Sequence, residues 1–203
     1  MATLIKNANI ANDSWQQLEF AVDGGLPVIP AAGDILVPLA LWQAAAGALL
    51  ARSTGRVGVW LAPDEDPAQI ADSLDALDLI AVHFPQFTDG RGYSTARLLR
   101  ERYGWKGELR ATGDVQRDQL FYLSRCGFDA FLLNDGSDVP QGDLLRGVPQ
   151  GDLLRSAPQG DLLRSAQAAL SAFADFSEAY QTSVERPLPL FRRRQSPDGM
   201  EWS

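Results

Sequence analysis

Apolar and polar positions follow two alternating periods in the central part of the chain. Short apolar runs with the length and composition of buried strands lie at 57–62, 79–84, 108–112 and 128–133. Stretches with the spacing of amphipathic helices separate them, at 67–77, 95–104 and 115–127. Because strands that alternate with helices form β-α-β units, we expect an α/β fold with a small parallel sheet. The pattern leaves an open sheet and a half-barrel as alternatives.

The two ends of the chain predict further elements. Residues 4–20 hold an Asn-Asp-Ser turn between two semi-apolar runs, which predicts an N-terminal edge hairpin. Towards the other end, an apolar stripe from Leu162 to Val184, with Asp161 as N-cap, predicts a long C-terminal helix that packs on the sheet. Residues 185–203 predict an extended, Pro-rich C-terminal arm.

Residues 138–164 are a tandem repeat of a nine-residue unit that contains PQGDLLR. Pro149 and Pro158 would break a continuous helix, and the unit is shorter than the roughly 20 residues that a solenoid repeat needs. We interpret the segment as a duplication within a surface loop. The alternative is a binding array that uses the repeated leucine pairs.

Composition narrows the class of protein. The chain has 203 residues, 45% of them hydrophobic, so we expect a single α/β domain over 1–203. A net charge of −8 argues against nucleic acid or an anionic membrane surface as a partner. The sequence has no apolar run long enough to cross a membrane, and its start lacks the features of a secretion signal. We therefore expect a cytoplasmic protein that binds small molecules or other proteins.

A polar turn, FTDGRG at 87–92, separates the second expected strand from the next helix. Because the loops that follow parallel strands meet at one edge of the sheet, this turn should lie beside the loops after the other strands. We call this edge the rim. Its expected polar groups come from four loops and include Asp64, Glu65, Asp66, Asp89, Arg91, Asp114, Asn134 and Asp135.

The turn itself suggests an anion site. Arg91 lies between two glycines and beside the start of a helix, a position that capping alone does not explain. The candidate catalytic acid–base groups are Asp89 and Asp114. The candidate anion-binding residues are Arg91, Gly92, Tyr93 and Ser94.

Each of these residues also has a structural interpretation. Ser94 is placed to be an N-cap, with Tyr93 packed on Leu98 as a hydrophobic staple. Asp66 and Asp114 are equally suited to cap the helices that follow them. The two glycines of the turn would then only supply positive φ.

The remaining reactive residue types predict no catalytic cluster. His83, the single histidine, lies near the end of an apolar strand and is expected to be a core or rim residue rather than a general base. Cys126, the single cysteine, is expected to be a small buried side chain, and it excludes an iron–sulfur site within one chain. The rim carboxylates could hold Mg²⁺, but no spacing requires it. We predict no metal site and no cofactor.

Residues 84–131 resemble the bacterial family of domain of unknown function 934. The motifs that carry the resemblance are T-D-G-R-G-Y-S, A-x-L-L-R, G-E-L-R-A-x-G-D-V, D-Q-L and R-x-G-F-D. The resemblance continues through ILVPLALW and GVWLAPDEDP to the ending RPLPLFRRR, and it leaves out the nine-residue repeats.

The resemblance implies a role beside sulfite reduction. The family has no established activity, but its genes are commonly found beside that of the haemoprotein subunit of sulfite reductase, and some members carry an oxidoreductase label. We therefore expect an accessory protein of assimilatory sulfate or sulfite reduction, with sulfite reductase as partner. The alternative is a small α/β enzyme for an anionic, sulfated or phosphorylated metabolite, with Asp89 or Asp114 as acid–base group and Arg91 as anion clamp.

Overall fold

All four apolar runs predicted as strands form strands in the computed structural model, which describes residues 3–7, 9–20, 25, 27–133 and 183–184. They pair in parallel and in chain order, as β-α-β units require. Their bounds are β5 Val57–Leu61, β6 Leu79–Phe84, β7 Glu108–Gly113 and β8 Ala130–Leu133.

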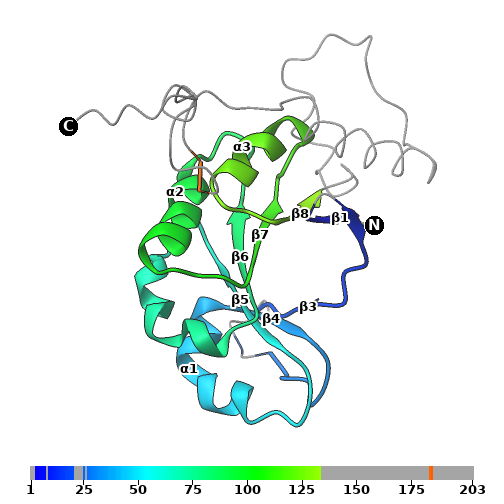
Figure 1. Cartoon of the computed structure of the whole chain (residues 1–203). Coiled ribbons are helices and arrows are strands. Elements are labelled where there is room, and N and C mark those ends of the chain that lie inside the picture. Colours follow the sequence, from blue (N-terminus) through cyan, green and yellow to red (C-terminus); the bar gives the residue numbers. More distant parts are fainter. Residues whose placement is uncertain (1–2, 8, 21–24, 26, 134–182, 185–203) are drawn as a thin grey trace, which may run out of the picture.

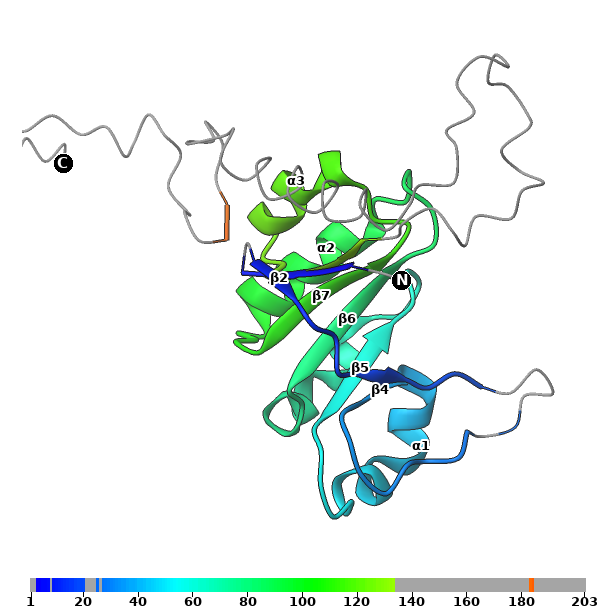
Figure 2. The ribbon, with the colours of Figure 1, turned by 90° about the vertical axis from the view of Figure 1, so that its right-hand side faces the viewer.

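The complete sheet is mixed, so the prediction of a purely parallel sheet is wrong. It has eight strands in the order β2-β1-β8-β7-β6-β5-β4-β3 and curls into a half-barrel, the second of the two predicted alternatives (Figures 1 and 2). Strands β3 to β8 are parallel, whereas β1 is antiparallel to both β2 and β8. A tight turn is enough to join antiparallel strands, so no helix is needed between β1 and β2. The added strands are β1 Thr3–Lys6, β2 Asn9–Ala11, β3 Gln16–Gln17 and β4 Ile35–Pro38.

The predicted N-terminal hairpin is present at one edge of the sheet, but its turn lies elsewhere. The chain reverses after Asn7, whose φ of 49° is in the left-handed region that asparagine tolerates. The Asn-Asp-Ser segment at 12–14 belongs instead to the connection from β2 to β3. Because these two strands are the opposite edges of the sheet, the connection crosses one of its faces (Figure 2).

Helices form at the three helical stretches predicted from the sequence, with different types and bounds, and α1 precedes them. The segment predicted at 67–77 is a 3-10 helix, and the helix predicted at 95–104 begins four residues earlier and ends as a π-helix. The bounds are α1 Leu39–Leu50, η1 Pro67–Ala76, α2 Arg91–Arg97, η2 Leu98–Arg102, η3 Arg117–Gln119 and α3 Leu120–Arg125.

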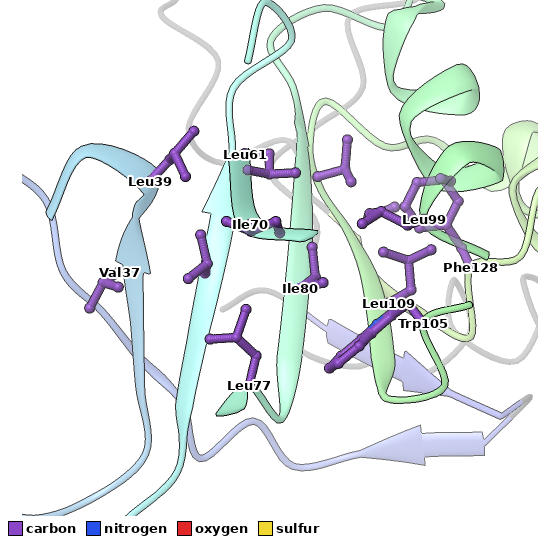
Figure 3. Close-up of a cluster of buried hydrophobic side chains, with 14 of the residues drawn as sticks. Val37, Leu39, Leu61, Ile70, Leu77, Ile80, Leu99, Trp105, Leu109 and Phe128 are labelled. Carbon is purple, nitrogen blue, oxygen red and sulfur yellow. The ribbon is translucent and has the colours of Figure 1, made fainter. Parts of the chain in front are cut away.

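The main core lies between the sheet and the helices (Figure 3). Alternate residues of the central strands, such as Ile80 and Val82 of β6, point into it. Apolar residues from the helices complete it, among them Trp42, Ile70 and Leu99. We call this side of the sheet the helix face.

The opposite side, the second face, carries the other alternate residues. Directly paired positions place Leu79 beside Glu108, Ala81 beside Arg110 and His83 beside Thr112. A small apolar cluster of Leu36, Leu79 and Ala81, with Trp15 and Trp60 packed on it, also lies here, and no described helix contributes to that cluster. The connection from β2 to β3 covers this face instead.

Several sequence predictions lie outside the described residues. These are the repeat at 138–164, the arm at 185–203 and most of the predicted C-terminal helix. Ser183 and Val184 are described and are not helical; the Val184 N–H donates to the Arg125 carbonyl at 3.0 Å. Among the described residues, no helix has the length and apolarity to cross a membrane.

Candidate functional site

The rim predicted from the sequence forms at the carboxyl ends of β5, β6 and β7. The loops after β6 and β7 touch directly, since the Phe87 N–H donates to the Asp114 carboxylate at 2.8 Å. The hydrogen bond with Asp89 is the main cause of the raised pKa of Arg91, and the charge of Asp64, from the loop after β5, adds to it, which places Asp64 near Arg91. Asn134 and Asp135, in the loop after β8, fall outside the described residues.

The FTDGRG segment begins in a tight turn. The Asp89 N–H donates to the Gln86 carbonyl at 2.9 Å, which closes the turn around Phe87 and Thr88. Gln119 donates from its side-chain amide to the Phe87 carbonyl at 3.0 Å. The two backbone polar groups of Phe87 are thus both satisfied by side chains of the neighbouring loop and helix.

Arg91 and Asp89 bind each other. Two guanidinium nitrogens of Arg91, Nη2 and Nε, lie 2.6 and 3.0 Å from the two Asp89 oxygens, and the Arg91 backbone N–H also donates to this carboxylate. Hydrogen bonds from the side chain and backbone of Arg91, together with its charge, lower the pKa of Asp89. Asp89 is therefore an ionised partner of Arg91, which does not suit a general acid at neutral pH.

Gly92 and Tyr93 have clear packing roles. A Cβ atom on Gly92 would lie 2.5 Å from the Phe84 ring, so this position admits only glycine without movement. The Tyr93 ring packs edge-on against Phe84 with 5.5 Å between ring centroids, and its hydroxyl accepts a hydrogen bond from Gln119 at 3.3 Å. Tyr93 thus packs on Phe84.

The capping interpretation is correct for Asp66 and wrong for two other residues. Asp66 accepts from the Ala68 N–H at 2.9 Å, with Pro67 as the first residue of η1. Ser94 is an exposed residue inside α2, because that helix starts at Arg91, so neither an N-cap nor a staple forms there. Asp114 accepts the Phe87 N–H and does not cap η3, the helix that follows it.

The helix after Asp114 is capped by two glutamines. The Gln116 side chain accepts from the backbone of Gln119, and the Gln119 side chain accepts from the Gln116 N–H at 2.9 Å. Gln119 is buried and every polar group of its side chain is used, which ties η3 to Phe87 and Tyr93. Gln119 was not among the residues predicted for the rim; the spacing Gln-x-x-Gln ahead of an apolar run is the signal that could have indicated it.

A second group of polar residues, on the second face, was not predicted as a site. Arg110 is 2% exposed; its guanidinium makes paired contacts of 2.7–3.0 Å with the carboxylates of Glu108 and Asp13. Lys6 binds Glu108 from the other side at 2.6 Å. Burial would raise the pKa of Glu108, but the hydrogen bonds and charges of Lys6 and Arg110 outweigh it and lower that pKa. The signal in the sequence is the alternation of Glu108, Arg110 and Thr112 with apolar residues in a central strand.

His83 is half-buried on the second face, near the carboxyl end of β6. Its ring lies 6.1 Å from that of Trp60 between centroids, in an edge-on arrangement. Burial lowers its pKa, and the nearby charge of Glu19 raises it by a smaller amount. The imidazole is therefore mainly neutral at pH 7. This position fits the rim histidine expected from the sequence.

The described residues contain no group of three or more His, Cys, Asp or Glu side chains that could hold a metal ion. Cys126 is half-buried and packs against the main core, and burial raises the pKa of its thiol. It is thus mainly a protonated thiol at neutral pH, in keeping with the packing role expected for it.

The predicted acid–base groups and the arginine of the rim consequently all have partners within the protein. The predicted acid–base and anion-binding residues lie together, as expected, but Asp89 neutralises Arg91, and Asp114 binds a backbone N–H. The catalytic role of Asp89 and Asp114 and the anion-binding role of Arg91, Gly92, Tyr93 and Ser94 stay predictions.

Comparison with known proteins identifies a family without identifying a function. No curated protein matches the chain. Residues 58–145 match the family of bacterial proteins of unknown function DUF934. The matched stretch runs from the second residue of β5 past the end of β8, so it contains all three described rim loops. Residues 58–145 of this chain are therefore similar to the DUF934 family, as the sequence motifs predict.

Proposed function

We propose that this protein is a non-catalytic accessory protein of assimilatory sulfate or sulfite reduction, which acts in the cytoplasm by binding sulfite reductase. The association with sulfite reduction comes from the family resemblance of the sequence. The choice of a binding role over a catalytic one comes from the rim.

One observation carries the choice: Asp89, Arg91 and Asp114, the predicted acid–base and anion-clamp groups of the rim, are committed to contacts within the protein. An anion clamp needs an arginine whose guanidinium is free to meet the ligand, yet Arg91 is held in two-point contact by Asp89. A general acid or base needs a carboxyl group that can exchange protons with a substrate, yet Asp114 accepts a backbone N–H. These contacts hold the rim in one shape, which is what a protein-binding surface requires.

Direct binding tests the accessory role. The purified full chain is mixed with the haemoprotein subunit of sulfite reductase and the mixture is analysed by sedimentation velocity. We expect a complex, and we expect deletion of the gene to slow growth on sulfate but not on cysteine. Absence of a complex together with normal growth on sulfate would refute the proposal.

The second candidate is an enzyme for an anionic metabolite, with Arg91 as clamp. The observation in its favour is that the Arg91 side chain is 58% exposed, so that an anion could compete with Asp89 in the ion pair. Titration with sulfite, sulfate and phosphate, followed by the side-chain NMR signals of the arginines, tests this candidate. Saturable shifts that Arg91→Ala removes would favour the enzyme. Unchanged spectra at millimolar anion would favour the accessory role.

A further inference from the structure

Phe87 has a rigid backbone and an exposed side chain. The residue lies in a rim loop and is 41% exposed. Its N–H donates to Asp114, its carbonyl accepts from Gln119, and the turn around it is closed by the contact between Gln86 and Asp89. A loop that only connects β6 to α2 does not need three independent contacts to hold the residue at its tip.

Two of these contacts come from elements distant in sequence. Asp114 follows β7, and Gln119 is the last residue of η3. Gln119 is buried, and its amide also binds Tyr93 and Gln116, so it cannot release Phe87 without losing other hydrogen bonds. The Phe87 backbone is thus fixed before any partner arrives.

Fixing an exposed aromatic residue in advance is favourable for binding. An aromatic ring supplies a large apolar contact area, and aromatic residues are common among those that dominate binding energy. Ordering a loop during binding costs free energy, and a loop that is already held avoids this cost. In an isolated protein, by contrast, the same arrangement leaves apolar surface in water.

The charges around Phe87 indicate the chemistry of the partner. Asp89 lies in the turn, Asp114 binds the Phe87 N–H and Asp64 lies near Arg91, and Arg91 offsets one of these three negative charges. The whole chain carries −8, so a second copy would be repelled at this surface. A partner with positive charge around an apolar pocket would be attracted.

We propose that Phe87 is the anchor of a protein-docking surface, and that its partner offers an apolar pocket bordered by lysine or arginine side chains. The identification of that partner as the haemoprotein subunit of sulfite reductase rests on the proposed function. The docking role of Phe87 and the basic character of the partner's pocket do not depend on the proposed function.

Affinity for the haemoprotein subunit gives the first test. Phe87→Ala should weaken binding about tenfold or more, as expected for an anchor residue. Leu50→Ala is the control: Leu50 is 50% exposed, but it ends α1 and so lies at the opposite end of the sheet from the rim. Asp114→Asn keeps an acceptor for the Phe87 N–H and removes one charge, so it should reduce the salt dependence of the affinity. Equal affinities for Phe87→Ala and wild type would overturn the docking role and leave the proposed function intact.

Cross-linking in cells tests docking without assuming the partner. A photoreactive phenylalanine analogue replaces Phe87 in one strain and Leu50 in another, and the cross-linked peptides are mapped after growth on sulfate. We expect cross-links from position 87 alone, to a peptide that lines an apolar pocket with basic residues beside it. If that peptide belongs to another protein, the docking role holds and the choice of sulfite reductase is wrong. Cross-links to a second copy of the chain, to an acidic surface, or to nothing would overturn the inference.

Discussion

The two glycines that flank Arg91 differ in their surroundings. A Cβ atom on Gly92 would lie 2.5 Å from the Phe84 ring, which is itself held by Tyr93 and Phe128. A Cβ atom on Gly90 would meet no atom within 4 Å, and its φ of −87° suits any residue. Gly92 is therefore required by close packing, and neither residue is required for positive φ.

We predict that Gly92→Ala lowers the free energy of unfolding by about 1–3 kcal/mol, because Phe84 must move to admit the new methyl group. Gly90→Ala is the matched control and should change it by no more than about 0.5 kcal/mol. Urea unfolding followed by tryptophan fluorescence measures both. Equal losses for the two variants would mean that the contact with Phe84 is not what constrains Gly92.

The single histidine permits a direct measurement of one pKa. His83 should titrate below the usual value of about 6.5, because burial disfavours its charged form. A depressed pKa of a base means that the unfolded chain binds more protons in this range, so stability should fall as the pH drops through 6.5 towards the folded-state pKa.

The ring-proton NMR signal of His83 follows this titration without assignment problems, since the chain has one histidine. Glu19→Gln should lower the midpoint further, because the Glu19 charge favours the protonated ring. A midpoint at or above the usual value would show that His83 is solvated. A midpoint that does not respond to Glu19→Gln would show that the two groups are well separated.

At the scale of elements, two polar residues near helix starts have opposite roles. Asp66 accepts from the backbone of η1, whereas Ser94 lies inside α2 and makes no cap there. Asp66→Ala should lower the free energy of unfolding by about 1 kcal/mol. Ser94→Ala should leave it unchanged or raise it by up to about 0.5 kcal/mol, because alanine is the better helix former. Thermal unfolding of the two variants measures both changes. A larger loss of unfolding free energy for Ser94→Ala than for Asp66→Ala would restore the N-cap interpretation of Ser94.

At the scale of the whole molecule, one ion pair links the connection between the two edge strands, β2 and β3, to the central strand β7. Asp13 lies in the connection from β2 to β3 and binds Arg110 of β7 with both oxygens, at 3.0 and 2.9 Å. Arg56 adds a second anchor, since it stacks over Trp15 and binds Asp34 at 2.6 Å. The connection is thus held across the second face by charged groups as well as by the packing of Trp15 on the small apolar cluster.

Asp13→Ala should lower the free energy of unfolding by about 1–3 kcal/mol, because it leaves the buried Arg110 with one carboxylate partner fewer. Asp75→Ala, at an exposed position of η1, is the control and should stay within about 0.5 kcal/mol of wild type. Hydrogen exchange provides a second readout: the Leu18 N–H, which bonds the Leu36 carbonyl, should exchange faster in Asp13→Ala. Unaltered stability and exchange would show that the ion pair does not hold the connection.

The pattern of residues was enough to predict the parallel β-α-β units, because the period of apolar residues records which side of each strand and helix is buried. It also predicted that the loops after β6 and β7 meet, since parallel strands end at the same edge; the contact between Phe87 and Asp114 confirms this. The similarity to the DUF934 family was also predicted, from motifs that lie within the matched residues 58–145.

How the sheet ends and what the rim contains depend on tertiary structure. Strand β1 pairs antiparallel with β8 because the edge of the sheet at β8 is free to accept it. The sequence of a short strand does not specify which edge it joins or in which direction. The pairing of Arg110 with Asp13 joins residues 97 positions apart, and the bonds from Asp114 and Gln119 to Phe87 span 27 and 32 positions. Periodicity specifies which side of an element faces the core, whereas the partner of a polar side chain depends on where separate segments approach in space.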